Sequence, residues 1–159
     1  MTPRLRMLAG PNGSGKSTLA QRLVDDYAVN LYKFLNADML FAEIGKSHRT
    51  ACPFSIDNGD LLAFIDGSTY PEPCKRPFRE GQIAIDEEDY LVFAPEAVSS
   101  YTVAMTADFF KEQYLAHRLS FSFETVFSHP AKVDILKRAR SEGSGPTCTS
   151  SPRKIPAST

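Results

Sequence analysis

Cysteine is scarce in this sequence, and so is an excess of charge of one sign. The 159 residues contain three cysteines, Cys52, Cys74 and Cys148, and none of them belongs to a C-x-x-C pair. We therefore expect a reduced, cytoplasmic protein without a cysteine-bound metal. Lys and Arg together number 18 against 19 Asp and Glu. With charges this balanced, we do not expect a nucleic-acid binder that works through bulk positive charge.

Long apolar runs are also missing. No run approaches the roughly 20 residues that a membrane-spanning helix needs. The apolar stretch near the start ends at Ala9, which is too early for a secretory signal peptide. We expect no membrane segment and no secretory leader. With 42% apolar and 23% charged residues, the composition is that of a globular protein, and its length predicts one domain.

Strand and helix patterns alternate along the chain. Apolar or alternating stretches predict strands over Arg4–Ala9, Leu31–Asn36 and Leu119–Glu124. Apolar residues at three- and four-residue spacing predict helices over Lys16 to about Tyr27, Asp38–Ile44 and Glu96–Ala116. A last helix is expected between Ser128, which would cap it, and Gly143, which would end it, with Pro130 in its first turn. This order predicts an α/β fold with a mainly parallel sheet.

Three of these helices carry apolar residues that we expect to face the core. In the helix that starts at Lys16 they are Leu19, Leu23, Val24 and Tyr27. In the helix over 96–116 they are Val98, Tyr101, Met105 and Phe109, and in the last helix they are Val133 and Leu136. Between the second and third helices, a stretch rich in Pro and Gly predicts an insertion of short helical and extended pieces over about 46–96.

The most specific motif follows the first predicted strand. The segment from Gly10 to Ser17 matches G-x-x-x-x-G-K-[ST] at every fixed position, which predicts a loop whose backbone N–H groups bind the phosphates of a nucleoside triphosphate. Lys16 is expected to reach the β- and γ-phosphates, and the Ser17 hydroxyl to bind Mg²⁺. The residues expected to contact nucleotide are Gly10, Pro11, Asn12, Gly13, Ser14, Gly15, Lys16, Ser17 and Thr18. The motif also predicts a three-layer fold of the P-loop NTPase type.

Absent motifs and two carboxylates distinguish among the reactions that a phosphate loop can serve. The sequence has neither the Asn-Lys-x-Asp of GTPases nor the Leu-Ser-Gly-Gly-Gln of transporter ATPases. A kinase needs a carboxylate near the acceptor, and Asp38 follows the second strand, where it would accept a hydroxyl proton or cap the next helix. Glu124 ends the third strand, where it would orient the acceptor, hold a water of Mg²⁺ or form a salt bridge. Thr125 is a weaker candidate for substrate contact.

The sequence resembles the zeta-toxin-like P-loop kinases over roughly residues 4–143. The likeness rests on three segments, Met7–Thr18, Phe34–Asp38 and Ser120–Pro130. It implies ATP and Mg²⁺, an aspartate base at Asp38 and an acceptor-side glutamate at Glu124. Zeta toxins proper phosphorylate UDP-N-acetylglucosamine and are restrained by an antitoxin protein, so the resemblance implies a sugar-nucleotide-like hydroxyl acceptor and such a partner.

The sequence departs from this family after residue 143. Family members continue with an apolar strand and a helical lid whose arginines bind the triphosphate. Here Ser, Thr and Pro supply 10 of the 16 residues in Ser144–Thr159, which predicts a disordered tail beside a kinase-like domain of residues 1–143. These residues can be encoded so that the neighbouring reading frame gives an apolar strand and a turn. This leads to the hypothesis of a frameshifted, truncated kinase.

That hypothesis has consequences for stability and activity. In the family's strand order, the first strand would lack a neighbour on one side, which predicts marginal stability. Without the lid arginines, it predicts weak or absent kinase activity. Two further functions stay open: a remnant that binds ATP without catalysis, and a general P-loop ATPase.

Overall fold

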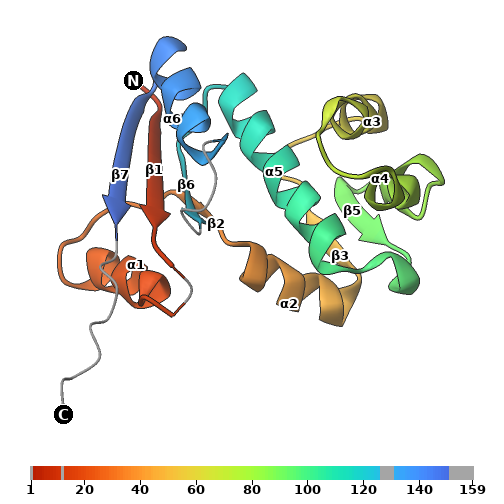
Figure 1. Ribbon diagram of the computed structural model, residues 1–159, viewed down its shortest axis with the longest axis horizontal. Coiled ribbons are helices and arrows are strands. Elements are labelled where there is room, and N and C mark those ends of the chain that lie inside the picture. Colours follow the sequence, from red (N-terminus) through yellow and green to blue (C-terminus); the bar gives the residue numbers. More distant parts are fainter. Residues whose placement is uncertain (1, 12, 126–130, 151–159) are drawn as a thin grey trace. The chain divides into compact units, whose positions relative to one another are not determined.

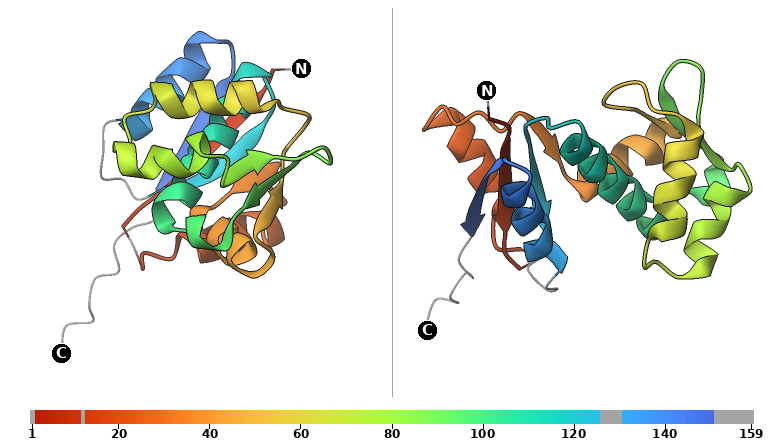
Figure 2. Two further views of the ribbon diagram at one scale, coloured as in Figure 1. Left: turned by 90° about the vertical axis from the view of Figure 1, so that its right-hand side faces the viewer. Right: turned by 90° about the horizontal axis from the view of Figure 1, so that it is seen from above.

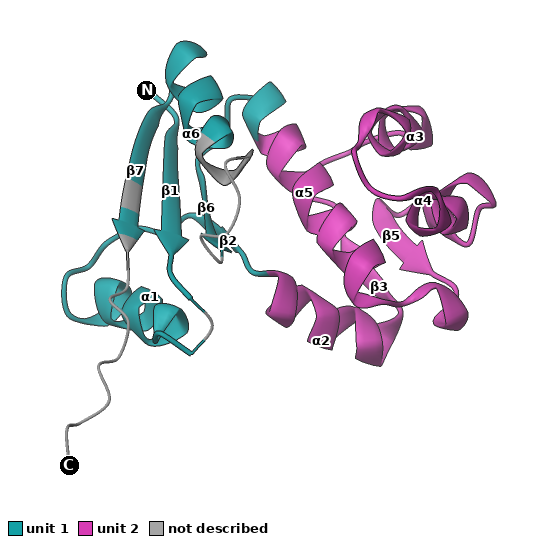
Figure 3. Ribbon diagram, viewed as in Figure 1, with its two compact units in different colours: residues 1–36, 115–159 teal, residues 37–114 magenta. Residues whose placement is uncertain are grey.

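The computed structural model describes residues 2–11, 13–125 and 131–150. The chain divides into two compact units, which Figure 3 colours separately. The first unit comprises residues 1–36 and 115–159, and the second comprises residues 37–114. The second unit contains the whole range of the predicted insertion, together with the helix before it and most of the helix after it.

The first unit is built on a four-stranded parallel sheet (Figure 1). In the order in which they lie side by side, its strands are β2 (Lys33–Leu35), β6 (Phe121–Thr125), β1 (Arg4–Ala9) and β7 (Gly145–Ser150). Every neighbouring pair is parallel, which confirms the predicted α/β class. Side chains on both faces of the central strands are buried, including Leu5, Met7, Leu8, Phe121 and Phe123.

Two helices cover this sheet. The helix α1 (Lys16–Asp25) connects β1 to β2, and α6 (Ala131–Ser141) connects β6 to β7. Each connection passes over one strand, but the two run in opposite directions across the sheet. Because such crossovers are right-handed, they bring the two helices to opposite faces, as the right-hand view of Figure 2 shows. The predicted three layers are present in this unit.

The strand β7 corrects two predictions. A disordered tail was expected from residue 144, but Gly145–Ser150 pairs with β1 along its whole length. The tail prediction is wrong over this range, and so is the expectation that β1 lacks a neighbour on one side. Residues 151–159 lie outside the described residues, and the shifted reading frame stays a prediction.

A proline marks the outer edge of β7. Gly145 donates its N–H to the Pro3 carbonyl at 2.8 Å, so its peptide group faces β1. Peptide groups alternate along a strand, so that of Thr147 also faces β1 while those of Pro146 and Cys148 face outward. Proline has no N–H and is tolerated at an outward position. Among the described strands, β7 therefore forms an edge of the sheet.

The helix α1 follows the sequence pattern only in part. Leu19 and Leu23 pack against a buried cluster that contains Leu8, Ala20 and Leu31, as the spacing predicts. The helix ends at Asp25 rather than near Tyr27, and both Val24 and Tyr27 are exposed. The expectation that these two residues face the core is wrong, because the side of α1 that meets the cluster carries residues 19, 20 and 23.

The helix α6 ends at Ser141, and Gly143 two residues later stops it, as predicted. This glycine has φ +85°, which other residues rarely adopt. Its N–H donates to the Arg140 carbonyl at 3.2 Å, and the Ser144 N–H donates to the Ala139 carbonyl at 2.8 Å. These two bonds form a Schellman motif. The predicted capping residues Ser128 and Pro130 and the side chain of Val133 lie outside the described part, and Leu136 is half-buried.

The second unit combines a small antiparallel sheet with helices (Figure 1, and the left-hand view of Figure 2). Its strands lie in the order β3 (Arg49–Ala51), β5 (Tyr90–Phe93) and β4 (Ile83–Ile85). The helices are α2 (Ala37–Ser47), α3 (Asn58–Gly67), α4 (Glu72–Arg79), the 3-10 turn η1 (Pro95–Ala97) and α5 (Ser100–Ala116). Short helical and extended pieces were expected here, and α2 is longer than predicted.

The helix α5 begins at Ser100, four residues later than predicted, because η1 occupies the preceding segment. Met105 and Phe109 are fully buried, as expected. Tyr101 is 61% exposed, so its assignment to the core was wrong, and Val98 precedes the helix. Within the described ranges, no helix combines the length and the apolar character needed to cross a membrane.

Candidate functional site

The predicted phosphate loop connects β1 to α1 and has open space beside two of its glycines. Gly13 and Gly15 adopt φ +73° and +86°, and a Cβ atom built at either position meets nothing within 4 Å. Among the described residues, the N–H groups of Gly13, Gly15 and Lys16 donate no hydrogen bond. The first N–H groups of a helix have no partner inside the helix. The loop therefore offers main-chain donors of the kind that bind phosphate.

Lys16 is the first residue of α1 and is buried. Its Nζ donates to the carbonyl oxygens of Gly10 at 2.9 Å and Pro11 at 3.0 Å. The same nitrogen lies 3.9 Å from Oε1 of Glu124. These contacts keep the ammonium group at the phosphate loop, close to the loop's main-chain N–H groups.

Glu124 enters the site from the neighbouring strand. It stands opposite Leu8 in the pairing of β6 with β1, one position before the end of both strands. Its Oε2 accepts from the Ser17 hydroxyl at 3.3 Å, and its side chain is 14% exposed. The structure therefore brings Lys16, Ser17 and Glu124 together, although Glu124 was assigned to the acceptor side.

Thr125 follows Glu124 and has a structural contact with the loop. Its carbonyl accepts from the Gly10 N–H at 3.2 Å, and the residue is buried. This bond ties the end of β6 to the start of the phosphate loop. Its predicted contact with substrate stays a prediction.

The remaining predicted site residues lie at other points along the chain. Asp38 lies in the first turn of α2, in the second unit, two residues after the first unit's segment ends. Thr18 follows Ser17 in α1. Asn12 lies outside the described residues.

Sequence reasoning missed Asn36. Its Nδ2 donates to Oε2 of Glu124 at 2.8 Å, the same oxygen that Ser17 contacts. Asn36 directly follows β2, and Leu35 pairs with Phe123, so Asn36 and Glu124 take the next positions of the two paired strands. The residue lay inside the segment Phe34–Asp38, but its role depends on which strand neighbours β2.

The two oxygens beside the loop are suitable for a hard cation. The Ser17 hydroxyl and the Glu124 carboxylate are oxygen donors, which Mg²⁺ prefers over nitrogen and sulfur. In the described part of the chain, this site included, no group of three or more His, Cys, Asp or Glu side chains could hold a metal ion by itself. The residues present therefore fit Mg²⁺ bound together with a nucleotide.

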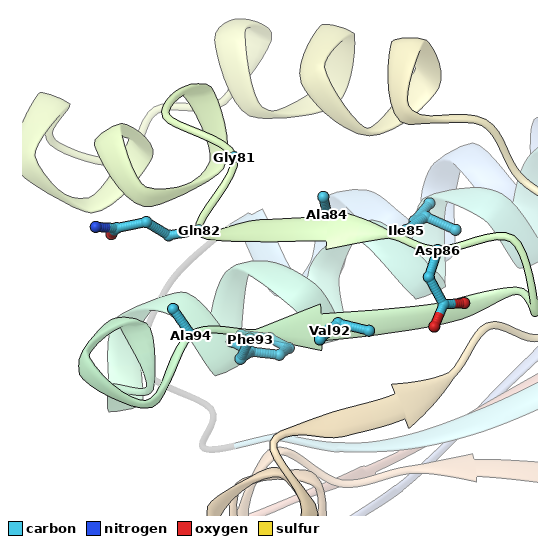
Figure 4. A pocket seen from close by; sticks show the side chains of 8 residues that line it. All are labelled: Gly81, Gln82, Ala84, Ile85, Asp86, Val92, Phe93 and Ala94. Carbon is cyan, nitrogen blue, oxygen red and sulfur yellow. The ribbon is translucent and has the colours of Figure 1, made fainter.

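A hollow in the second unit lacks such chemistry. It has a volume of about 470 Å³, is open to solvent and is lined by residues of β4, β5 and their ends (Figure 4). Its one acidic side chain, Asp86, accepts from the N–H groups of Glu88 and Tyr90 at 2.9 Å, so it closes the turn between the strands. No lysine or arginine lines the hollow, which makes it unsuitable for phosphate.

Comparisons with known proteins leave the family open. No protein-family model matches the chain, and no curated protein matches it. Among solved structures, a provisionally assigned kinase from Chloroflexus aurantiacus is similar, with 14% sequence identity and a TM-score of 0.45. The match covers 94% of this chain and 59% of that protein. This chain therefore spans less than two thirds of the length of that neighbour.

Proposed function

We propose that this chain binds ATP with Mg²⁺ and acts as a kinase on the hydroxyl group of a small substrate. The observation that supports this most directly is the cluster of Lys16, Ser17 and Glu124 beside a loop in which the N–H groups of Gly13 and Gly15 donate no hydrogen bond to any described residue. An anion bound by several backbone N–H groups at a helix start, next to an ammonium group, is the arrangement that phosphoryl transfer uses.

Each residue has a distinct part in this proposal. The loop amides and Lys16 would bind the phosphates and offset negative charge as the γ-phosphoryl group transfers. Ser17 and Glu124 would hold Mg²⁺, which would offset the negative charge of the phosphates when bound. We therefore move Glu124 from the acceptor side to the metal side, because its Oε2 contacts Ser17.

The acceptor side rests on the sequence resemblance. The acceptor oxygen would form a bond to the γ-phosphorus while the bond from that phosphorus to the β,γ-bridging oxygen breaks and ADP leaves. Asp38 would take the hydroxyl proton. UDP-N-acetylglucosamine is the first acceptor to test, and an antitoxin partner and a cytoplasmic location stay predictions.

The experiment measures binding and reaction separately. Thermal shift and calorimetry with ATP–Mg²⁺ should show binding to the unaltered protein and its loss in Lys16→Met, which keeps most of the apolar stem. Lys137→Met removes an exposed lysine of α6 and serves as the control, with binding unchanged. No affinity of a folded, unaltered protein for ATP–Mg²⁺ would overturn the proposal.

ADP formation with and without UDP-N-acetylglucosamine then separates the three functions. Acceptor-dependent ADP formation that falls in Asp38→Asn supports the kinase. Hydrolysis of ATP that does not depend on the acceptor indicates a general P-loop ATPase. Binding of ATP without turnover indicates a remnant that no longer catalyses a reaction.

A further inference from the structure

Asn36 makes a specific contact with the carboxylate beside the phosphate loop. Its Nδ2 lies 2.8 Å from Oε2 of Glu124, and the bond is partly buried. Ser17 donates to the same oxygen at 3.3 Å, whereas Lys16 faces Oε1 at 3.9 Å. The two oxygens of Glu124 therefore have different surroundings. Oε2 accepts hydrogen bonds from Asn36 and Ser17, whereas Oε1 lies near Lys16.

We propose that Asn36 is a positioning residue that holds Oε2 of Glu124 toward Ser17 and thereby sets the affinity of the site for Mg²⁺. The inference rests on the proposed function, because it assumes that Ser17 and Glu124 bind the cation. Groups that hydrogen-bond to a metal ligand commonly change metal affinity by about 10–100-fold when they are removed.

The chemistry of an amide suits this task. A glutamate side chain has several rotatable bonds, and a fixed donor removes part of the freedom that it would lose on metal binding. The Asn36 amide is neutral, so it orients the carboxylate without neutralising it. A lysine or arginine at the same place would also orient Glu124, but its positive charge would oppose the cation.

The backbone fixes Asn36 independently of the phosphate loop. It follows β2 directly, and the pairing of β2 with β6 places it beside Glu124. Its amide therefore reaches Glu124 from the neighbouring strand, on the far side from β1. Oε2 of Glu124 thus accepts hydrogen bonds from residues that follow both neighbouring strands, from Ser17 after β1 and the loop and from Asn36 after β2.

The alternative is a purely structural role, in which Asn36 only ties the ends of two strands together. Two substitutions of similar size distinguish these roles. Asn36→Leu removes the donor, whereas Asn36→Asp places a second carboxylate against Glu124. A structural role predicts that Asn36→Leu loses stability without any change in its response to Mg²⁺.

The positioning role predicts opposite responses. In calorimetry, Asn36→Leu should bind ATP–Mg²⁺ about 10–100-fold more weakly while ATP in EDTA binds as to the unaltered protein. In Asn36→Asp, Mg²⁺ alone should raise the melting temperature more than in the unaltered protein, because the cation relieves the repulsion between the carboxylates. Equal Mg²⁺ dependence of ATP binding in Asn36→Leu and in the unaltered protein would overturn the inference.

A matched control is available in the second unit. The side chain of Asn58 donates to the Ile85 carbonyl at 2.9 Å and accepts from its N–H at 2.8 Å, so its role is structural. Asn58→Leu should lower the melting temperature without changing the Mg²⁺ dependence of ATP binding. If the unaltered protein binds no ATP with or without Mg²⁺, the proposed function fails. If it binds and Asn36→Leu retains its Mg²⁺ dependence, only the role of Asn36 fails.

Discussion

Glu124 shows how much of the candidate site depends on a single side chain. It contacts Ser17 and Asn36 through one oxygen and lies near Lys16 through the other. Lys16 has two carbonyl oxygens as further partners, so it stays hydrogen-bonded even where the carboxylate is turned away. The carboxylate can therefore reorient toward a cation without leaving the buried ammonium group unsatisfied.

Cys52 is a second residue whose chemistry depends on its surroundings. Burial, followed by the negative charges of Asp89 and Asp86, raises the pKa of its thiol to about 11. Its N–H donates to the Asp89 carbonyl at 2.9 Å, which keeps it close to that carboxylate. All of these causes disfavour the thiolate, the form that reacts with alkylating agents.

We predict that native Cys52 reacts with iodoacetamide at pH 8 about a hundredfold more slowly than the same cysteine in urea, because an ordinary thiol has a pKa of about 8.5. Mass spectrometry of the peptide that contains Cys52 measures both rates. The raised pKa also means that this thiol contributes stability below the ordinary pKa and loses it as the pH rises toward 11. Equal rates in the native and unfolded protein would contradict the prediction.

At the scale of elements, β7 shows how backbone direction decides which residues a strand tolerates. Its outward positions accept a proline at residue 146, whereas its inward positions donate to β1. An inward proline would remove an N–H from the ladder and leave a carbonyl of β1 without its donor. The two sets of positions alternate, so neighbouring residues should respond differently to the same substitution.

We predict that Thr147→Pro lowers the free energy of unfolding by about 1–3 kcal/mol more than Cys148→Pro, because only the former loses a hydrogen bond to β1. Both substitutions impose the same limit on φ, so their difference isolates the hydrogen bond. Urea unfolding followed by circular dichroism measures it. A larger loss in Cys148→Pro would show that β7 pairs in another register.

At the scale of the whole molecule, each unit has apolar residues buried within its own elements. Phe123 lies in the parallel sheet of the first unit, and Leu91 lies in the antiparallel sheet of the second, and both are fully buried. Chains with more than one compact unit commonly depart from two-state unfolding. The two units can therefore open with different free energies.

We predict that Phe123→Ala and Leu91→Ala act mainly on their own units, each costing about 2–5 kcal/mol through lost burial and a cavity. Hydrogen exchange measured by mass spectrometry should show faster exchange in residues 2–36 and 115–125 for the first variant and in residues 37–114 for the second. Equal acceleration across both units in both variants would indicate a single cooperative structure.

The sequence by itself determined the local features of this protein. The phosphate-loop motif, the strand–helix alternation and the glycine that ends α6 depend on residues close together in the chain, so spacing and residue type were sufficient. The apolar stripes were only partly predictable. Val24, Tyr27 and Tyr101 fit the helical spacing but are exposed, because spacing does not say which side of a helix meets the core.

Only the tertiary structure decided which distant residues meet. Ser17 and Glu124 are 107 positions apart, and Asn36 and Glu124 are 88 apart, so their contacts depend on the order β2-β6-β1 in the sheet. The same holds for β7, whose polar residues gave no strand signal and form a strand because β1 offers an edge to pair with. Strand order arises from long-range pairing and burial, and local residue patterns do not contain it.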